Sequence, residues 1–338
     1  MQTLGLVSVI MPVYRGELFV AAAIESVLAQ TFQSFELVII NDGTPDDSAR
    51  EIARFLPHPK IRYVEQNNAG VAGARNAGLD HATGALIALL DQDDVWLPHK
   101  LERQVAYLNA HPELGFVHSR VDCIDGAGEV CSCEGAIWVY PFEGFCAGEL
   151  LLGNGIAPLT VLMRRQCVDE VGPFDQRLAP ADDWDLWIRI AERYPVGFID
   201  EVTARYRVHD QNTSKDRLKM QHAVLKIMDG VAAHLPEIAR SVSTGQLAAA
   251  RSLALSRAAE ALEGSGRSRE ARGYWKEAFQ VGGNIEAFLA ILGVPPRHRN
   301  GVERFLARTP RFRRLVRWYL YKASRMFTRN FPTNERSH

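Results

Sequence analysis

The feature that most constrains the fold is an alternation of apolar runs with segments of helical periodicity over the first third of the chain. Strands buried on both faces of a parallel sheet form near-continuous apolar runs, and such runs occupy residues 6–13, 35–40, 61–64 and 85–90. Helical spacing fills the intervals, at residues 17–30, 48–56 and 72–81. The alternation predicts βαβ units with right-handed crossovers, and therefore a Rossmann-like α/β domain.

The pattern continues less regularly to about residue 214. We expect helices at residues 98–110 and 182–193, and strands at residues 116–121, 156–163, 196–199 and 204–208. Residues 122–149 are rich in Gly and Cys and poorly periodic, so we expect an irregular segment there. From residue 215 onward the pattern is helical, with a predicted hairpin of two helices around residues 264–266. The expected organisation is an α/β domain at 1–214, in halves 1–110 and 111–214, and an all-helical extension at 215–338.

Bulk composition excludes several protein classes. The chain has 338 residues, 47% of them hydrophobic, and a formal net charge of -1, so no nucleic-acid partner is expected. No uncharged apolar stretch has the length of about 18 residues that a membrane span needs, and the N-terminus lacks the features of a signal peptide. The five cysteines include no C-x-x-C spacing, which favours buried, reduced thiols in a cytoplasmic protein over a zinc site.

The clearest candidate site is the acidic run that follows the apolar segment at 85–90. Asp91, Gln92, Asp93 and Asp94 lie there, and carboxylates this close repel one another unless a cation lies between them. Oxygen ligands suit Mg²⁺ or Mn²⁺, which bind through one or two carboxylates together with substrate phosphates. The alternative is a polar loop in which Asp93 or Asp94 caps the next helix.

Three further positions carry candidate chemistry, each with a structural alternative. Asp42 follows the second apolar run and offers acceptors to a nucleobase N–H, or closes a simple turn. Arg75, early in a predicted helix, pairs with a diphosphate or base carbonyl, or lies in solvent. Asp182 and Asp183 open a helix, where acids suit the helix dipole; alternatively, one of them is a general base whose pKa is raised by neighbouring acids and tryptophans.

Taken together and in order, these elements resemble family 2 glycosyltransferases, which have the GT-A fold. The resemblance spans residues 7–214. It is carried by five segments: VSVIMPVYRGELFVAAAIESVLAQTFQSFELVIINDGTPDDS, NNAGVAGARNAGLDHATGALIALLDQDDVW, LTVLMRRQCVDEVGPFD, DDWDLWIRIAE and YRVHDQNTS. The resemblance implies a GT-A domain with a mixed, mostly parallel sheet flanked by helices, and an inverting transferase that uses a nucleotide-diphosphate sugar.

The resemblance also assigns roles on the donor side. It implies that Pro12, Val13 and Tyr14 form the base-binding edge of the first strand. Asp42 contacts the base, typically uracil, and Arg75 helps to bind the same nucleotide.

Further implied roles concern the ribose and the metal. Asp91 approaches the ribose, and Asp93 coordinates the Mn²⁺ or Mg²⁺ that bridges the diphosphate. His209 is a second metal or diphosphate contact by the same resemblance, or else an ordinary loop histidine.

On the acceptor side, Asp183 aligns with the catalytic base of the family. The preceding acid is usually Glu, whereas this chain has Asp182, which puts the acceptor contact in doubt and leaves room for the base to be one residue away. A lipid-linked or glycan acceptor in cell-surface polysaccharide synthesis is implied. The alternative function is a non-catalytic nucleotide-sugar-binding or scaffold protein that acts through its helical tail.

Residues 302–330 are strongly basic and interleaved with aromatic residues. A basic amphipathic helix there would lie on an anionic membrane surface, which makes the protein peripheral at the inner face of the cell membrane. The alternative is a helix that packs its apolar side on the protein and leaves its arginines in water.

Overall fold

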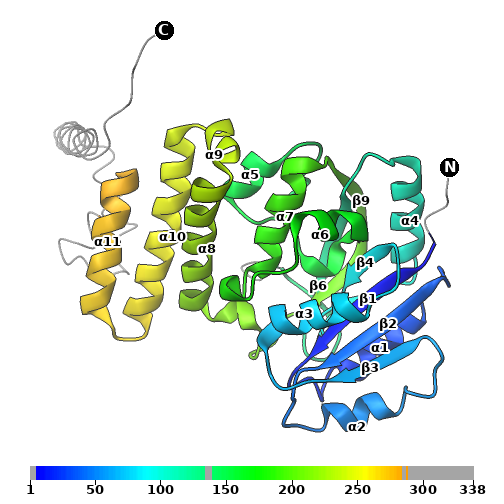
Figure 1. Cartoon of the computed structure of the whole chain (residues 1–338). Helices are drawn as coiled ribbons and strands as arrows, with labels where there is room; N and C mark the ends of the chain where they lie inside the picture. Colours follow the sequence, from blue (N-terminus) through cyan, green and yellow to red (C-terminus); the bar gives the residue numbers. More distant parts are fainter. Residues whose placement is uncertain (1–4, 134–138, 284–286, 288–338) are drawn as a thin grey trace. The chain divides into compact units, whose positions relative to one another are not determined.

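A computed structural model describes residues 5–133, 139–283 and 287. The described residues form two compact units (Figure 1). The first runs to Asp216 and includes Asp229–Ser241, and the second comprises Arg217–Met228 together with the described residues from Val242 onward.

The first unit is built on one mixed sheet, whose strand order is β3-β2-β1-β4-β8-β6-β9-β5, with β7 paired to β6. Its strands are β1 Val7–Val13, β2 Phe35–Asn41, β3 Ile61–Glu65, β4 Leu86–Leu89, β5 Val95–Trp96, β6 Phe116–Ile124, β7 Val130–Cys131, β8 Leu162–Arg164 and β9 Val196–Arg207. The strands β3, β2, β1 and β4 are parallel, as the βαβ pattern predicts. Antiparallel pairing enters with β8, which joins β4 to β6.

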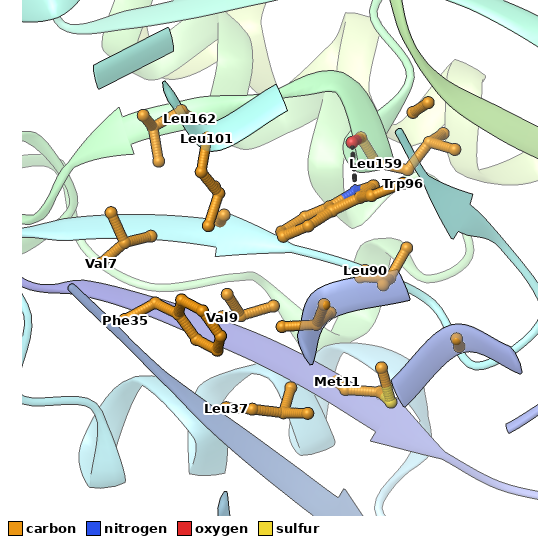
Figure 2. Close-up of a cluster of buried hydrophobic side chains, with 14 of the residues drawn as sticks. Val7, Val9, Met11, Phe35, Leu37, Leu90, Trp96, Leu101, Leu159 and Leu162 are labelled. Carbon is orange, nitrogen blue, oxygen red and sulfur yellow. Dashed lines mark hydrogen bonds between the residues drawn. The ribbon is translucent and has the colours of Figure 1, made fainter. Parts of the chain in front are cut away.

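Helices cover both faces of this sheet. The helices of the first unit are α1 Val20–Leu28, α2 Ser48–Ala53, α3 Gly70–His81, α4 Lys100–Ala110, α5 Ala147–Leu152, α6 Arg165–Val171, α7 Asp182–Arg193 and α9 Pro236–Ser241, the last of which contacts α5. Alternate residues of a strand point to opposite faces. Val9 and Met11 of β1 therefore join α1 and α4 in the main apolar core, where the indole of Trp96 donates to the carbonyl of Leu159 (Figure 2).

The other face of β1 packs against α3. Here Ile10 lies so close to Gly78 that a Cβ at Gly78 would stand 2.3 Å from Cγ2 of Ile10. The glycine therefore sets how closely α3 approaches the sheet. This packing matters for the site because α3 carries Arg75.

The second half of the sheet differs from the prediction. The two strands expected at 196–199 and 204–208 are one strand, β9, whose register with β6 shifts at Arg120. The exposed Asp200 and Glu201 lie at this irregularity, which explains why the apolar pattern breaks there. Residues 122–149 include the end of β6, β7 and the start of α5, and residues 156–163 form a 3-10 turn (Pro158–Thr160) before β8.

The second unit is helical. Its described helices are the first part of α8 (Arg217–His234), α10 (Thr244–Gly264) and α11 (Ser268–Gly282). The last two form the predicted hairpin, which closes on the buried Trp275 and on a hydrogen bond from Ser252 to the carbonyl of Ala278. A capping box of Ser243 and Gln246 begins α10. Among the described residues no helix is both long and apolar enough to span a bilayer, and the basic segment 302–330 lies outside them.

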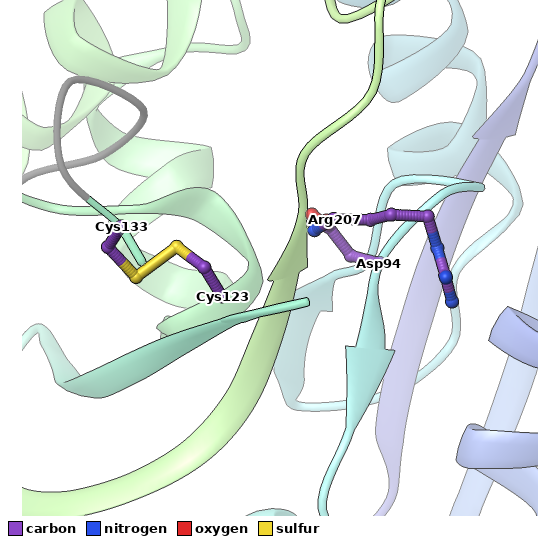
Figure 3. Close-up of a disulfide and its surroundings, with 4 residues drawn as sticks. All are labelled: Asp94, Cys123, Cys133 and Arg207. Atoms are coloured by element: carbon purple, nitrogen blue, oxygen red, sulfur yellow. A yellow bond between two sulfur atoms is a disulfide. The ribbon is translucent and has the colours of Figure 1, made fainter. Parts of the chain in front are cut away.

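The cysteines correct one expectation. Cys123 and Cys133 form a disulfide (Figure 3), so the prediction of reduced thiols is wrong for this pair. The hairpin of β6 and β7 folds the chain back on itself, which brings Cys133 to Cys123 in a way that a spacing of ten residues does not reveal. Cys131, Cys146 and Cys167 are free thiols.

Candidate active site

The candidate site lies where three adjacent parallel strands end. Tyr14 follows β1, and the loops after β2 and β4 bring Asp42 and Asp91 to the same edge of the sheet, where open α/β sheets bind ligands. Gln92 ties two of these loops together. Its side chain accepts from the backbone N–H of Tyr14 at 2.6 Å and donates to the carbonyl of Tyr14 at 2.8 Å. The sequence reasoning gave Gln92 no role, because its bonds to Tyr14 and its close approach to Gly16 exist only in the folded chain.

The strand end proposed for base binding is only partly open. Pro12 and Val13 are buried in the sheet, whereas Tyr14 is 40% exposed. The ring of Tyr14 is therefore the only one of the three side chains with a large accessible surface.

Asp42 is buried and already holds part of the scaffold. Its Oδ1 accepts from the Gln66 side chain at 2.7 Å and from the backbone N–H of Ala69 at 2.8 Å, and its Oδ2 accepts from the N–H of Gly70 at 2.9 Å. The carboxylate thus binds two backbone N–H groups at the start of α3. A carboxylate has about four acceptor positions, so the described residues leave one on Oδ2.

Arg75 links the two halves of the first unit. Its Nη1 donates to Asp182 at 2.9 Å, and its Nη2 donates to both carboxylate oxygens of Asp91 at 3.0 and 3.1 Å. The guanidinium also lies over the ring of Phe174. Burial opposes its charge, but Asp91, Asp182 and Asp183 together hold the pKa of Arg75 above its usual value. Rather than lying in solvent, Arg75 is 3% exposed, and the contacts it makes join the loop after β4 to the first turn of α7.

Asp183 has the properties of a general base. It is buried at the start of α7, and one oxygen accepts from the backbone N–H of Trp184 at 2.8 Å. Burial, together with the charges of Asp182 and Asp91, raises the pKa of Asp183 to about 7 despite the opposing effect of Arg75. A carboxylate with a pKa near neutrality combines a useful ionised fraction with a useful basicity.

Asp182 differs from its neighbour. It is fully buried, and Oδ2 is engaged by Arg75, while Oδ1 has no hydrogen-bond partner among the described residues. With no exposed surface, Asp182 is placed to act on the site through Arg75.

Asp93 and His209 come together although they are 116 residues apart. Asp93 Oδ2 lies 2.9 Å from His209 Nε2, and both side chains remain partly accessible. Two cis ligands of an octahedral Mg²⁺-sized ion are about 3 Å apart, so the spacing and the donor types fit a divalent cation. Within the described ranges no three His, Cys, Asp or Glu side chains converge. The pair therefore suits an ion that takes its other ligands from a diphosphate and water.

Arg207 fastens the end of β9 to this acidic loop. Its backbone N–H donates to Asp94 Oδ1 at 2.9 Å, and its Nε donates to the carbonyl of Asp93 at 2.8 Å. Burial, followed by the charges of Asp93 and Asp91, raises the pKa of Asp94 well above its usual value. The guanidinium of Arg207 also lies over the ring of Phe19, which contacts His209. The sequence reasoning missed Arg207, although it stands two residues before His209 in a recognised segment.

Comparison with known proteins gives a consistent result. The family model "Glycosyl transferase family 2" matches residues 8–161. An uncharacterized glycosyltransferase of Rickettsia felis is 32% identical over 212 residues, which cover 62% of this chain and 35% of that protein. The UDP-Glc:alpha-D-GlcNAc-diphosphoundecaprenol beta-1,3-glucosyltransferase WfgD of Escherichia coli is 30% identical over 216 residues, covering 63% of this chain and 81% of WfgD. The chain thus spans about a third of the Rickettsia relative and most of WfgD.

A solved structure agrees with the expected fold. The mannosyltransferase PcManGT from Pyrobaculum calidifontis, in complex with GDP-Man and Mn²⁺, superposes with a TM-score of 0.56 at 20% identity. The superposition covers 94% of this chain and 85% of that chain. At this identity the likeness concerns the fold alone, and it confirms the GT-A architecture.

Proposed function

Because this chain belongs to glycosyltransferase family 2, we propose that it transfers a sugar from a nucleotide-diphosphate sugar to a hydroxyl acceptor, with inversion at the anomeric carbon. The observation that carries the proposal is the position of Asp183. This buried carboxylate, whose pKa is raised to about 7, is joined through Asp182 and Arg75 to the acidic loop at the end of β4. The hydrogen bonds of Arg75 thus connect the proposed base with the edge of the sheet that is proposed to bind the donor.

In the proposed reaction Asp183 accepts the proton of the acceptor hydroxyl as that oxygen attacks the anomeric carbon. One base is enough for a single displacement, and the transition state has the oxocarbenium character of glycosyl chemistry. Tyr14 and the remaining acceptor position of Asp42 bind the nucleobase, and Asp91 is placed for the ribose. Arg75 orients Asp91 and Asp182 and lowers the cost of the buried charge of Asp182.

Asp93 and His209 are the proposed ligands of Mn²⁺ or Mg²⁺. When bound, such an ion neutralises charge on the leaving diphosphate. The Mn²⁺ in the complex of PcManGT, which shares the fold, supports a divalent cation here.

A UDP-sugar and a lipid-linked acceptor are the favoured substrates. The name of WfgD specifies UDP-Glc and an acceptor attached to diphosphoundecaprenol. An acceptor of this kind lies at a membrane, and we propose that the basic segment 302–330 holds the protein at the inner membrane face, in cell-surface polysaccharide or glycolipid synthesis. Flotation with vesicles of anionic lipid tests this placement. Loss of flotation on removal of 302–338 supports it, and equal flotation of both chains excludes it.

The central test is release of nucleoside diphosphate from a panel of UDP-, GDP- and dTDP-sugars, with a lipid-linked acceptor and with Mn²⁺ or EDTA. We expect release from one donor, abolished by EDTA. Asp183→Asn should retain donor binding and lose transfer. Asp185→Asn is the matched control, because Asp185 lies in the same helix turn but pairs with Arg189. Undiminished transfer by Asp183→Asn would exclude the assignment of the base, whereas donor binding without transfer by the unaltered chain would favour a binding protein.

A further inference from the structure

Three cysteines meet at the β6–β7 hairpin. Cys123 in β6 is bonded to Cys133, which lies just beyond β7 (Figure 3). Cys131 in β7 is the residue directly opposite Cys123 in the antiparallel ladder, and its thiol is free. A free thiol therefore lies beside a disulfide sulfur with which the backbone pairing already aligns it.

We propose that Cys123, Cys131 and Cys133 form a thiol–disulfide exchange site in which Cys131 and Cys133 compete for Cys123. Directly opposed residues of an antiparallel pair have Cα atoms about 4.5–5.5 Å apart, within the range of about 4.4–6.8 Å that a disulfide spans. Cys123 can thus bond to either partner without rearrangement of the ladder.

The exchange step is balanced within the chain. The thiolate of Cys131 attacks Sγ of Cys123, the Cys123–Cys133 bond breaks, and Cys133 leaves as a thiolate that takes up the proton given up by Cys131. One disulfide and one thiol are present before and after, so the step requires no external oxidant or reductant. Cys131 and Cys133 are partly exposed, which allows proton exchange with water.

The two remaining thiols serve as an internal contrast. Cys146 and Cys167 are buried, and burial raises the pKa of each thiol to about 12. They form almost no thiolate near neutral pH and have no disulfide partner. Reactivity is therefore confined to the hairpin.

The exchange site is connected to the acidic loop through Arg207. Cys123 pairs with Tyr206 of β9, and the next residue of β6 pairs with Arg207. The Arg207 guanidinium donates to the carbonyl of Asp125 at 2.9 Å and to that of Gly126 at 3.4 Å, both in the turn of the hairpin. The same side chain donates to the carbonyl of Asp93. Arg207 thus contacts both the turn of this hairpin and the acidic loop, and we expect a change at Arg207 to alter which of the two disulfides is favoured.

The test maps the disulfide in the full chain, purified without added thiol or oxidant. Samples are quenched with acid at intervals, alkylated with N-ethylmaleimide and analysed by peptide mass spectrometry. Each disulfide isomer leaves either Cys131 or Cys133 as a free thiol that N-ethylmaleimide can alkylate. In the unaltered chain we expect some molecules to be alkylated at Cys131 and the others at Cys133. In Cys131→Ser the alkylation of Cys133 should be lost. In Cys133→Ser, purified in air like the unaltered chain, dissolved oxygen should oxidise the thiols of Cys123 and Cys131 to a Cys123–Cys131 bond. Cys146→Ser is the control and should leave the division unchanged.

Three outcomes would overturn the proposal: no alkylation of Cys133 in the unaltered chain, alkylation of Cys123 alongside the other two, or a free Cys123 in Cys133→Ser. Coupling to the site is tested by Arg207→Lys, which retains the charge but loses the bond from Nη1 to the turn and the bond from Nε to the carbonyl of Asp93. A shifted division between Cys131 and Cys133 supports the coupling, and an unchanged division excludes it. None of these measurements requires glycosyl transfer, so the exchange site stands or falls independently of the proposed enzymatic function.

Discussion

At the scale of single residues, the most consequential side chain is that of Arg75. Replacing it with Met should leave the fully buried carboxylate of Asp182 without its partner, at a cost of about 3–5 kcal/mol in the free energy of unfolding, whereas the partly exposed Asp91 can be solvated by water. Arg54→Met is the matched control, since Arg54 makes an exposed helix-surface pair with Glu51, which contributes at most about 1 kcal/mol. Urea titration measures both. Equal losses would contradict the role given to Arg75.

The pKa of Asp183 predicts how transfer depends on pH. The base must be ionised, and its pKa is raised to about 7. The rate at saturating substrate should therefore rise about tenfold per pH unit below neutrality and level off above pH 7 or so. A profile from pH 5 to 9 checks this expectation. Asp185→Asn should keep the same profile, and a rate that stays flat down to pH 5 would show that another group is the base.

His118 predicts how stability depends on pH. It is buried in β6, where its Nε2 lies 3.0 Å from the carbonyl of Phe142, and burial lowers the pKa of His118 to about 4. Between pH 6.5, the pKa of His118 in the unfolded chain, and about pH 4, its pKa in the folded chain, His118 binds a proton only in the unfolded chain. Stability should therefore fall as the pH drops through this window, by up to about 3 kcal/mol. The measurement is the urea midpoint against pH, with His118→Gln, in which this part of the dependence should disappear.

At the scale of elements, replacing a glycine with Ala should have opposite effects on stability in two helices, because Gly78 of α3 is packed against β1 and Gly230 of α8 has open space at its Cβ position. Gly78→Ala would bring a Cβ to 2.3 Å from Ile10, which should destabilise the first unit by about 1–3 kcal/mol. Gly230 lies inside α8 with nothing near its Cβ position, so Gly230→Ala should stabilise by about 0.5–1 kcal/mol. Both belong to the same unit, and thermal unfolding compares them directly. A harmless Gly78→Ala would mean that α3 can move outward.

An element could be predicted from the sequence where its burial leaves a regular apolar pattern. β1 is buried on both faces, so its apolar run is uninterrupted, and the predicted helix at 182–193 matches α7 because its apolar face repeats at the helical period. β9 was divided in the prediction because its irregularity places charged residues in the middle of a strand. The Cys123–Cys133 disulfide was missed because only the folded hairpin reveals which sulfurs are neighbours.

In the candidate site, too, some residues could be predicted from the sequence and others could not. The acids after β2 and β4 were recognisable because polar residues directly after buried strands gather at one sheet edge. Their partners were not, because a hydrogen bond such as that from Gln66 to Asp42 depends on side-chain orientation. The burial of Arg75 was also beyond the sequence, since an arginine in a helix with small neighbours is equally compatible with solvent.

At the scale of the whole molecule, the described residues divide into two compact units with separate apolar cores. We expect calorimetry to resolve two unfolding transitions. A ligand that binds only the folded form stabilises the unit that holds its site, so UDP with Mn²⁺ should raise one midpoint and leave the other unchanged. UDP with EDTA is the control. A single transition that moves as a whole when UDP and Mn²⁺ are added would show that the two units unfold together.

The bridge from Arg75 to Asp91 and Asp182 also bears on how such a chain can be rebuilt. A chimera of two transferases joins the N-terminal part of one to the C-terminal part of the other. Here a crossover placed anywhere between residues 91 and 182 takes Arg75 and Asp91 from one parent and Asp182 from the other. Chimeras should therefore succeed only when both parents agree on all three positions, and libraries can be filtered by that rule before any protein is made. The same rule would confine natural recombination to lineages that share the triplet.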